Sequence, residues 1–115
     1  MAPTSDAEVT LRIPARTWAT IDAEMDNTIS LAVVNGPEHA VTMGSAIRQA
    51  GWDQVPWVEG GWPPMTQEIT ISLTRRQWEF AAIQLDATIP VCASIGDHES
   101  EQLCRTALTT IRAGQ

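Results

Sequence analysis

The chain has no lysine and no tyrosine, and it has one phenylalanine and two cysteines among 115 residues. The absence of lysine excludes mechanisms that use a lysine nucleophile or a Schiff base. Two cysteines do not make a disulfide scaffold in a chain of this size, and we expect Cys92 and Cys104 to be buried thiols. No apolar run approaches a membrane-spanning length, and the start, "MAPTSDAEV", lacks the apolar core of a signal peptide. We therefore expect a cytoplasmic protein without membrane association.

Basic residues are also scarce, because fourteen acids face seven arginines and the net charge is −7. A chain of this charge repels nucleic acid and anionic membranes as a whole, so nucleic acid is an unlikely partner. The sequence has no glycine-rich phosphate loop, no Ser-His-Asp set and no zinc-finger spacing. We therefore expect no enzyme activity, no catalytic residues and no cofactor.

Two histidines, His39 and His98, lie near the starts of expected helices. Acids and Cys104 surround His98, but their spacing matches no established metal-binding pattern. An acidic helix N-terminus that suits the helix dipole explains the cluster better, and we expect no metal site there.

What the sequence does contain is an internal repeat. "EVTLRIPARTWATIDAEMDNTISLAVVNG" (8–36) aligns without a gap on "EITISLTRRQWEFAAIQLDATIPVCASIG" (68–96), and eight of 29 positions are identical. The identical pairs are Glu8/Glu68, Thr10/Thr70, Arg16/Arg76, Trp18/Trp78, Asp26/Asp86, Thr28/Thr88, Ile29/Ile89 and Gly36/Gly96. Self-similarity at a fixed spacing indicates duplication of a structural unit.

Each copy has the pattern of a strand followed by two helices. Apolar and polar residues alternate at 8–13 and again at 68–73, which is typical of a strand with one buried face. Leu11 placed opposite Ile71 also aligns the other apolar pairs, Val9 with Leu73 and Ile13 with Ile69, in an antiparallel ribbon. Apolar residues then recur at helical spacing, and the expected core contains Leu11, Trp18, Met25, Ile71, Trp78 and Leu85.

Capping signals give the expected helix boundaries. The segment Thr74–Gln77 has the spacing of a capping box, so a helix is expected to start there. Asn35-Gly36-Pro37 ends the first helix of copy one, with Gly36 available for a left-handed cap. Gly96 has the same role in copy two, with Asp97 as the N-cap of the last helix. Trp52 follows Gly51 and is expected to fold back on the last turn of its helix.

The stretch between the copies, "GWDQVPWVEGGWPP" (51–64), holds three of the five tryptophans. Trp57 and Trp62 have no counterpart in copy two, and two interpretations stay open. The rings cover part of the core, or they bind a partner with Asp53 and Glu59 beside them.

Two resemblances follow from these motifs. "EVTLRIPARTW" followed by "MGSAIRQAGW" resembles the ribbon–helix–helix family, which implies a strand that enters the DNA major groove, although the first helix here is longer than that family's. The groove-facing positions would be Glu8, Thr10, Arg12, Glu68, Thr70 and Ser72, and the two glutamates disfavour DNA. The second copy, from "LTRRQWEFAAIQL", resembles small uncharacterised proteins of actinobacteria and their phages, which implies no activity.

The expected fold is α+β, with two strand–helix–helix units related by a pseudo-two-fold and a two-stranded antiparallel ribbon packed on four helices. We expect a flexible tail (1–7) and one domain (8–115) made of a repeat (8–51), a tryptophan-rich linker (52–67) and a second repeat (68–113). The expected function is a small acidic module that binds another protein, as modulators, inhibitors and immunity proteins do. The alternatives are a single-chain ribbon–helix–helix-like DNA-binding protein and a structural or assembly subunit.

A two-stranded ribbon leaves two strand edges whose backbone groups have no neighbour. Thr10 and Arg12 lie on one expected edge strand, and Thr70 and Ser72 lie on the other. We therefore expect one edge to pair with a second copy in a homodimer, or to accept a strand from a partner.

Overall fold

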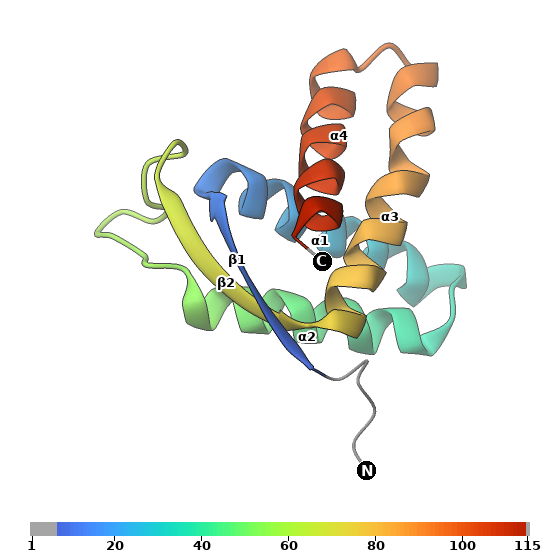
Figure 1. The fold of residues 1–115 in the computed structure, drawn as a ribbon. Coiled ribbons are helices and arrows are strands. Elements are labelled where there is room, and N and C mark those ends of the chain that lie inside the picture. The colour runs from blue at the N-terminus through green and yellow to red at the C-terminus, as the bar shows by residue number, and fades with distance from the viewer. Residues whose placement is uncertain (1–6, 115) are drawn as a thin grey trace.

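The computed structural model describes residues 7–114, so the expected tail lies outside the described residues except for Ala7. The elements follow in the order β1 (Glu8–Pro14), α1 (Ala15–Asn35), α2 (Glu38–Gln54), β2 (Glu68–Thr74), α3 (Arg75–Ser94) and α4 (His98–Ala113) (Figure 1). Within the described residues the fold is α+β, with one two-stranded antiparallel sheet and four helices, as the sequence predicts.

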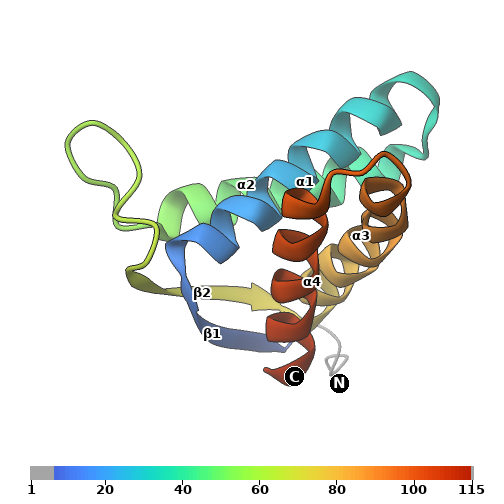
Figure 2. The same cartoon turned by 90° about the horizontal axis from the view of Figure 1, so that it is seen from above.

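The helices form two hairpins, α1 with α2 and α3 with α4. Helix α1 is central, because it contacts both helices of the other hairpin as well as α2. Figure 2 shows α1 between α2 and α4, and it shows the segment after α2 projecting from one end of the molecule. That segment, 55–67, connects the first hairpin to β2.

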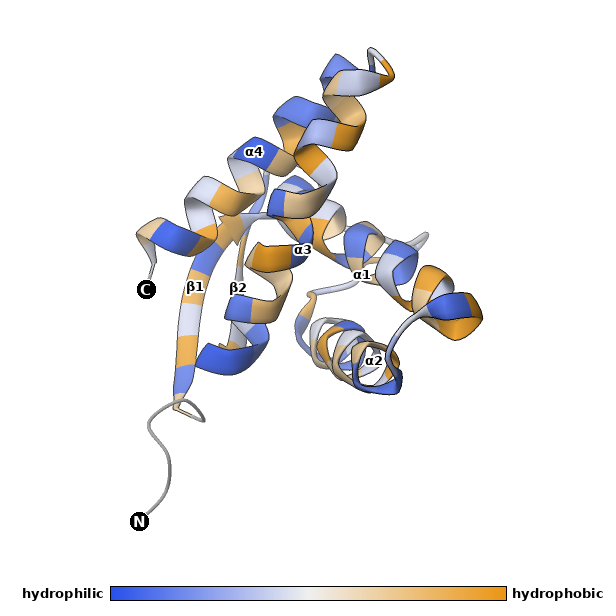
Figure 3. Ribbon diagram, turned by 90° about the vertical axis from the view of Figure 1, so that its right-hand side faces the viewer, coloured by the Kyte–Doolittle hydropathy of each residue, from blue (hydrophilic) through white to orange (hydrophobic). Residues whose placement is uncertain are grey.

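The strands pair in the expected register, with Leu11 opposite Ile71, Val9 opposite Leu73 and Ile13 opposite Ile69. The alternation of hydrophobic and hydrophilic residues along β1 is visible in Figure 3. One face of the sheet turns its apolar side chains toward the helices, while Thr10, Arg12 and Thr70 are exposed on the other. The observed pairing confirms the predicted register. Burial specifies it, because a shift by an odd number of residues would turn the apolar side chains into water.

The core joins both hairpins around two tryptophans. Trp18 of α1 and Trp78 of α3 are almost fully buried, and their rings meet edge to face with centroids 6.3 Å apart. The indole nitrogen of Trp78 donates a hydrogen bond of 2.8 Å to the Val9 carbonyl, so the ring has no unsatisfied donor. The other four residues expected in the core are also buried: Leu11, Met25, Ile71 and Leu85.

The expected caps of the second half are confirmed. The Thr74 hydroxyl accepts from the backbone N–H of Gln77, and the Gln77 side chain accepts from the N–H of Thr74, which makes a capping box. Asp97 caps α4 by accepting from the N–H of Ser100, and Gly96 has a left-handed φ of +77°.

Two boundary expectations of the first half are wrong. Gly36 ends α1 in an extended conformation, with φ −96° and ψ −179°, and not in a left-handed cap. Helix α2 does not stop at Gly51 but continues to Gln54. A Cβ at position 51 would overlap the indole ring of Trp18, so this glycine makes room for the core tryptophan inside the helix. Helix α2 therefore extends into the stretch that was expected to be a linker, and residues 55–67 connect it to β2.

Candidate functional site

A groove of about 630 Å³ lies between α1, the second half of α2 and the connecting segment. It is lined by four tryptophans, one aspartate, one arginine, one glutamine and three smaller or aliphatic residues: Trp18, Asp22, Ile29, Ser45, Arg48, Gln49, Trp52, Trp57, Gly61 and Trp62. A mostly apolar concavity with a few converging polar groups is the usual character of a ligand site. This groove is the candidate functional site.

Three tryptophans of the groove contact one another in a row, Trp52 to Trp57 to Trp62, with planes tilted by 45° and 60° between neighbours, and we call this row the stack. The ring centroids of Trp52 and Trp57 are 4.8 Å apart, and those of Trp57 and Trp62 are also 4.8 Å apart. The indole N–H of Trp57 donates a hydrogen bond of 2.8 Å to the backbone carbonyl of Trp52, which fixes the middle ring. Trp57 and Trp62 pack partly against the core, whereas Trp52 remains 64% exposed. The stack thus leads from the core to a ring that faces solvent.

A tight turn holds the tip of the connecting segment beside the stack. Val58 and Gly61 exchange two backbone hydrogen bonds of 2.9 Å across Glu59 and Gly60. Gly60 has a φ of +96°, a conformation that L side chains rarely adopt and that suits glycine at the third position of a turn. The turn presents Glu59 to solvent next to the groove.

One wall of the groove is an ion-pair cluster between α2 and α1. Arg48 donates from Nε to Asp22 at 3.0 Å and from Nη1 to Asp26 at 3.0 Å. The hydrogen bond to Asp22 raises the pKa of Arg48 above its ordinary value. Because one guanidinium faces two carboxylates, and because Asp53 and Glu59 add two more acids nearby, the surroundings of the groove carry negative charge.

The structure places Trp52 beside the predicted partner-binding residues, although the sequence predicted another position for Trp52. Trp57 and Trp62 line the groove, Glu59 lies at the turn beside it, and Asp53 is exposed on α2 and accepts a hydrogen bond from Gln49. Trp52 was expected to fold back on its helix, but it is part of α2 and is exposed. The spacing of Trp52 from Arg48, four residues, places both on one side of a helix and could have indicated this.

The predicted edge residues lie on two edges that differ. Gln54, the last residue of α2, accepts a hydrogen bond from the Ser72 N–H at 2.6 Å and donates one to the Ser72 carbonyl at 2.8 Å. Its amide therefore occupies the position of a neighbouring strand at the centre of β2. Both edges were expected to be open, and the structure shows that the edge of Thr70 and Ser72 is occupied at Ser72.

A second concavity, of about 450 Å³, lies between α1 and the α3–α4 hairpin and contains a buried carboxylate. Glu24 accepts a hydrogen bond from the Thr88 hydroxyl, and burial raises the pKa of Glu24. Cys92 and Cys104 line the same concavity as free, buried thiols. Burial raises the pKa of Cys104 to about 11, so this thiol is protonated at neutral pH and is a weak nucleophile.

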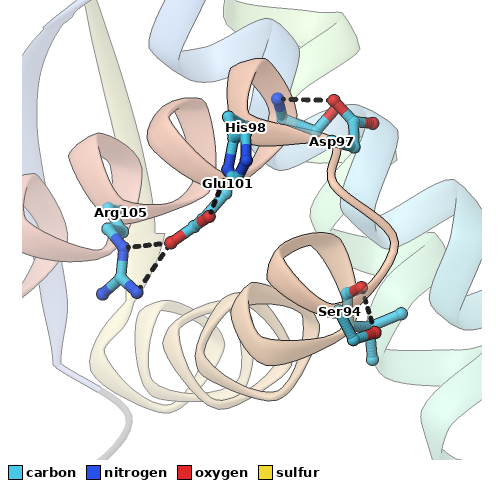
Figure 4. A network of polar contacts seen from close by, with 7 residues as sticks. Ser94, Asp97, His98, Glu101 and Arg105 are labelled. Atoms are coloured by element: carbon cyan, nitrogen blue, oxygen red, sulfur yellow. Dashed lines mark hydrogen bonds and ion pairs between the residues drawn. The ribbon is translucent and has the colours of Figure 1, made fainter.

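The histidine cluster at the start of α4 is engaged in helix-surface contacts (Figure 4). His98 Nδ1 lies 3.3 Å from Glu101, and Arg105 donates to the same carboxylate at 2.9 Å. Both contacts lower the pKa of Glu101, with that of Arg105 the larger. Within residues 7–114, no three His, Cys, Asp or Glu side chains are placed so that they could hold a metal ion.

Comparison with known proteins gives no relative: no family model, no curated protein and no solved structure matches the chain. In the part of the chain that the structure describes, no helix combines the length and apolar character needed to cross a membrane.

Proposed function

We propose that the protein is a small acidic binding module that holds a segment of another protein in the tryptophan groove. The observation that carries this proposal is Trp52, which is exposed at the open end of a three-ring stack anchored on the core. Tryptophan provides a large contact area at a low entropic cost and is enriched among residues that dominate binding energy. A ring that is held from behind and open in front is suited to that use.

The charge around the groove indicates the chemistry of the partner segment. The carboxylates of Asp53 and Glu59, and the excess carboxylate around Arg48, favour lysine or arginine side chains. A cation can also lie over the face of an indole ring, which adds to the attraction. The proposed ligand is therefore an apolar segment flanked by basic residues.

Selection of peptides from a random display library tests this proposal. The wild-type protein should enrich sequences that combine an apolar anchor with lysine or arginine, and binding should weaken as salt is raised. Trp52→Ala should not bind the enriched peptides, because it removes the exposed ring. The variant keeps the backbone carbonyl of residue 52, so the hydrogen bond from the Trp57 indole N–H is preserved. Ile83→Ala, which removes a similarly exposed apolar side chain from α3, is the matched control and should bind normally. Equal binding by both variants would contradict the proposal.

An alternative function is single-chain, ribbon–helix–helix-like DNA binding through the polar face of the sheet. Exposed Thr10, Arg12 and Thr70 favour it, but Arg12 already pairs with Glu68 at 2.9 Å and the face carries a second glutamate, Glu8. Salt-dependent retention on DNA that disappears in Arg12→Ala would support this alternative. A structural or assembly subunit is the remaining candidate, and complexes of fixed stoichiometry would identify it.

We also propose that the fold arose by tandem duplication with pseudo-two-fold symmetry. The order strand, helix, helix occurs twice, and the matched Trp18 and Trp78 meet in the core. The matched Asp26 and Asp86 each face an arginine of the next helix, Arg48 at 3.0 Å and Arg112 at 4.0 Å.

The two free thiols favour a reducing compartment, so a cytoplasmic location is part of the proposal.

A further inference from the structure

The outer edge of β1 has no cover of the kind that Gln54 gives to β2. Ser72 turns its N–H and C=O toward Gln54, away from β1, and Thr10 lies directly opposite Ser72. Opposite residues in an antiparallel ladder point their backbone groups either at each other or both away. Thr10 and its alternate neighbours Glu8 and Arg12 therefore direct their N–H and C=O groups outward. Across the described ranges, no other element forms a hydrogen bond with these groups of Thr10 and Arg12.

We propose that two copies of the chain pair through this edge, β1 against β1, to form a four-stranded antiparallel sheet with Thr10 opposite Thr10 of the second copy. Figure 2 shows β1 at the outer margin of the sheet, on the side away from α2. The pairing places each outward N–H beside an outward C=O at three successive hydrogen-bonded positions.

Charge and proline select this register among the alternatives. With Thr10 at the centre, Glu8 faces Arg12 of the second copy, and the two-fold axis repeats that pair of opposite charges. A register centred on Arg12 would oppose two arginines, which is destabilising. A register centred on Leu11 would put Glu8 opposite Pro14, which has no N–H to donate. Of these three registers, the proposed one uses all three donors and pairs their charges.

The covered edge of β2 makes the assembly close at two copies. Since Gln54 occupies the centre of that edge, each chain offers one open edge, and a two-fold pair leaves no open β1 edge behind. The residues that line the tryptophan groove come from α1, α2 and the connecting segment, and none comes from β1. Pairing through β1 is therefore independent of the proposed binding of a partner in the groove.

A charge-swap experiment with the full chain tests both the pairing and its register. Wild-type protein should show reversible association above the 12.5 kDa monomer in sedimentation at rising micromolar concentration. Glu8→Arg and Arg12→Glu should each sediment as a monomer, because each variant opposes like charges in the pair. An equimolar mixture of the two variants should again sediment as a dimer. In that mixed pair one chain carries only positive charge at positions 8 and 12, and the other carries only negative charge there.

Folding is controlled within the same experiment. Both variants change exposed side chains and should keep the wild-type circular dichroism spectrum, since the Arg12–Glu68 pair that one of them loses is solvent-exposed. Thr10→Pro is a further variant that removes an outward N–H without removing a backbone hydrogen bond between β1 and β2, and it should also be monomeric. It loses the exposed hydrogen bond of 2.6 Å between the Thr10 and Ser72 hydroxyls, so Thr10→Val, which loses that bond but keeps the outward N–H, is its control and should still form the dimer. A wild-type monomer at the highest concentration, or folded variants whose mixture stays monomeric, would overturn the proposal.

Discussion

At the scale of single residues, Gly51 shows how packing reverses a local preference. Alanine in place of glycine inside a helix normally stabilises a protein by about 1 kcal/mol. At position 51 the added methyl group would overlap the Trp18 ring. We expect Gly51→Ala to destabilise the protein by about 1–3 kcal/mol, the range for overpacking a core. Urea unfolding measures the difference, and an unchanged or higher midpoint would show that the ring can move away.

The buried Glu24 gives a pH-dependent prediction. Burial raises its pKa in the folded protein above the value near 4.5 of the unfolded chain. The folded state thus keeps the proton to a higher pH, and the stability that the neutral carboxyl provides is lost as pH rises through the folded pKa. Glu24→Gln cannot ionise and can still accept from Thr88.

The free energy of unfolding of Glu24→Gln, relative to wild type, should therefore increase as the pH rises from about 4.5 toward neutral. Thermal melts of the two proteins across that range measure the change. A difference that is constant, or that falls with pH, would show that the hydrogen bonds from Thr88 and Asn27 outweigh burial.

At the scale of elements, the end of α2 protects the edge of β2 through one side chain. In Gln54→Leu, the leucine side chain is nearly the size of glutamine but cannot form hydrogen bonds with the Ser72 N–H and C=O. We expect a loss of about 1–3 kcal/mol, because backbone groups at a partly buried position lose their partner. We also expect association beyond a dimer, because both edges of the sheet would then be open. Light scattering detects larger species, and Gln49→Leu on the same helix is the control that should leave the assembly unchanged.

At the scale of the whole molecule, both halves share one core and one sheet, so they should unfold together. Trp78→Ala should lower the free energy of unfolding by about 3–5 kcal/mol, the range for truncating a buried aromatic residue.

Far-ultraviolet circular dichroism and tryptophan fluorescence should report one coincident transition in the wild type. Separate transitions by the two probes would mean that the hairpins are stable independently of the Trp18–Trp78 contact.

The sequence by itself determined the elements, the register and most of the core. Alternation at 8–13 and 68–73 shows which strand face is buried, and a single register then aligns the apolar pairs. The capping box at Thr74 and the N-cap at Asp97 are local signals, since the interacting groups are three residues apart. Such features are readable because they depend on spacing along the chain.

Only the tertiary structure decided where α2 ends and what the connecting tryptophans do. Gly51 has the character of a helix stop, yet the ring of Trp18, distant in sequence, occupies the space beside it and the helix continues. That continuation places Trp52 in solvent at the end of the stack and brings Gln54 to the edge of β2. Helical or strand periodicity shows which side of an element is apolar, but not which distant side chain fills a given space. The groove and the difference between the two sheet edges therefore depend on contacts that no local pattern contains.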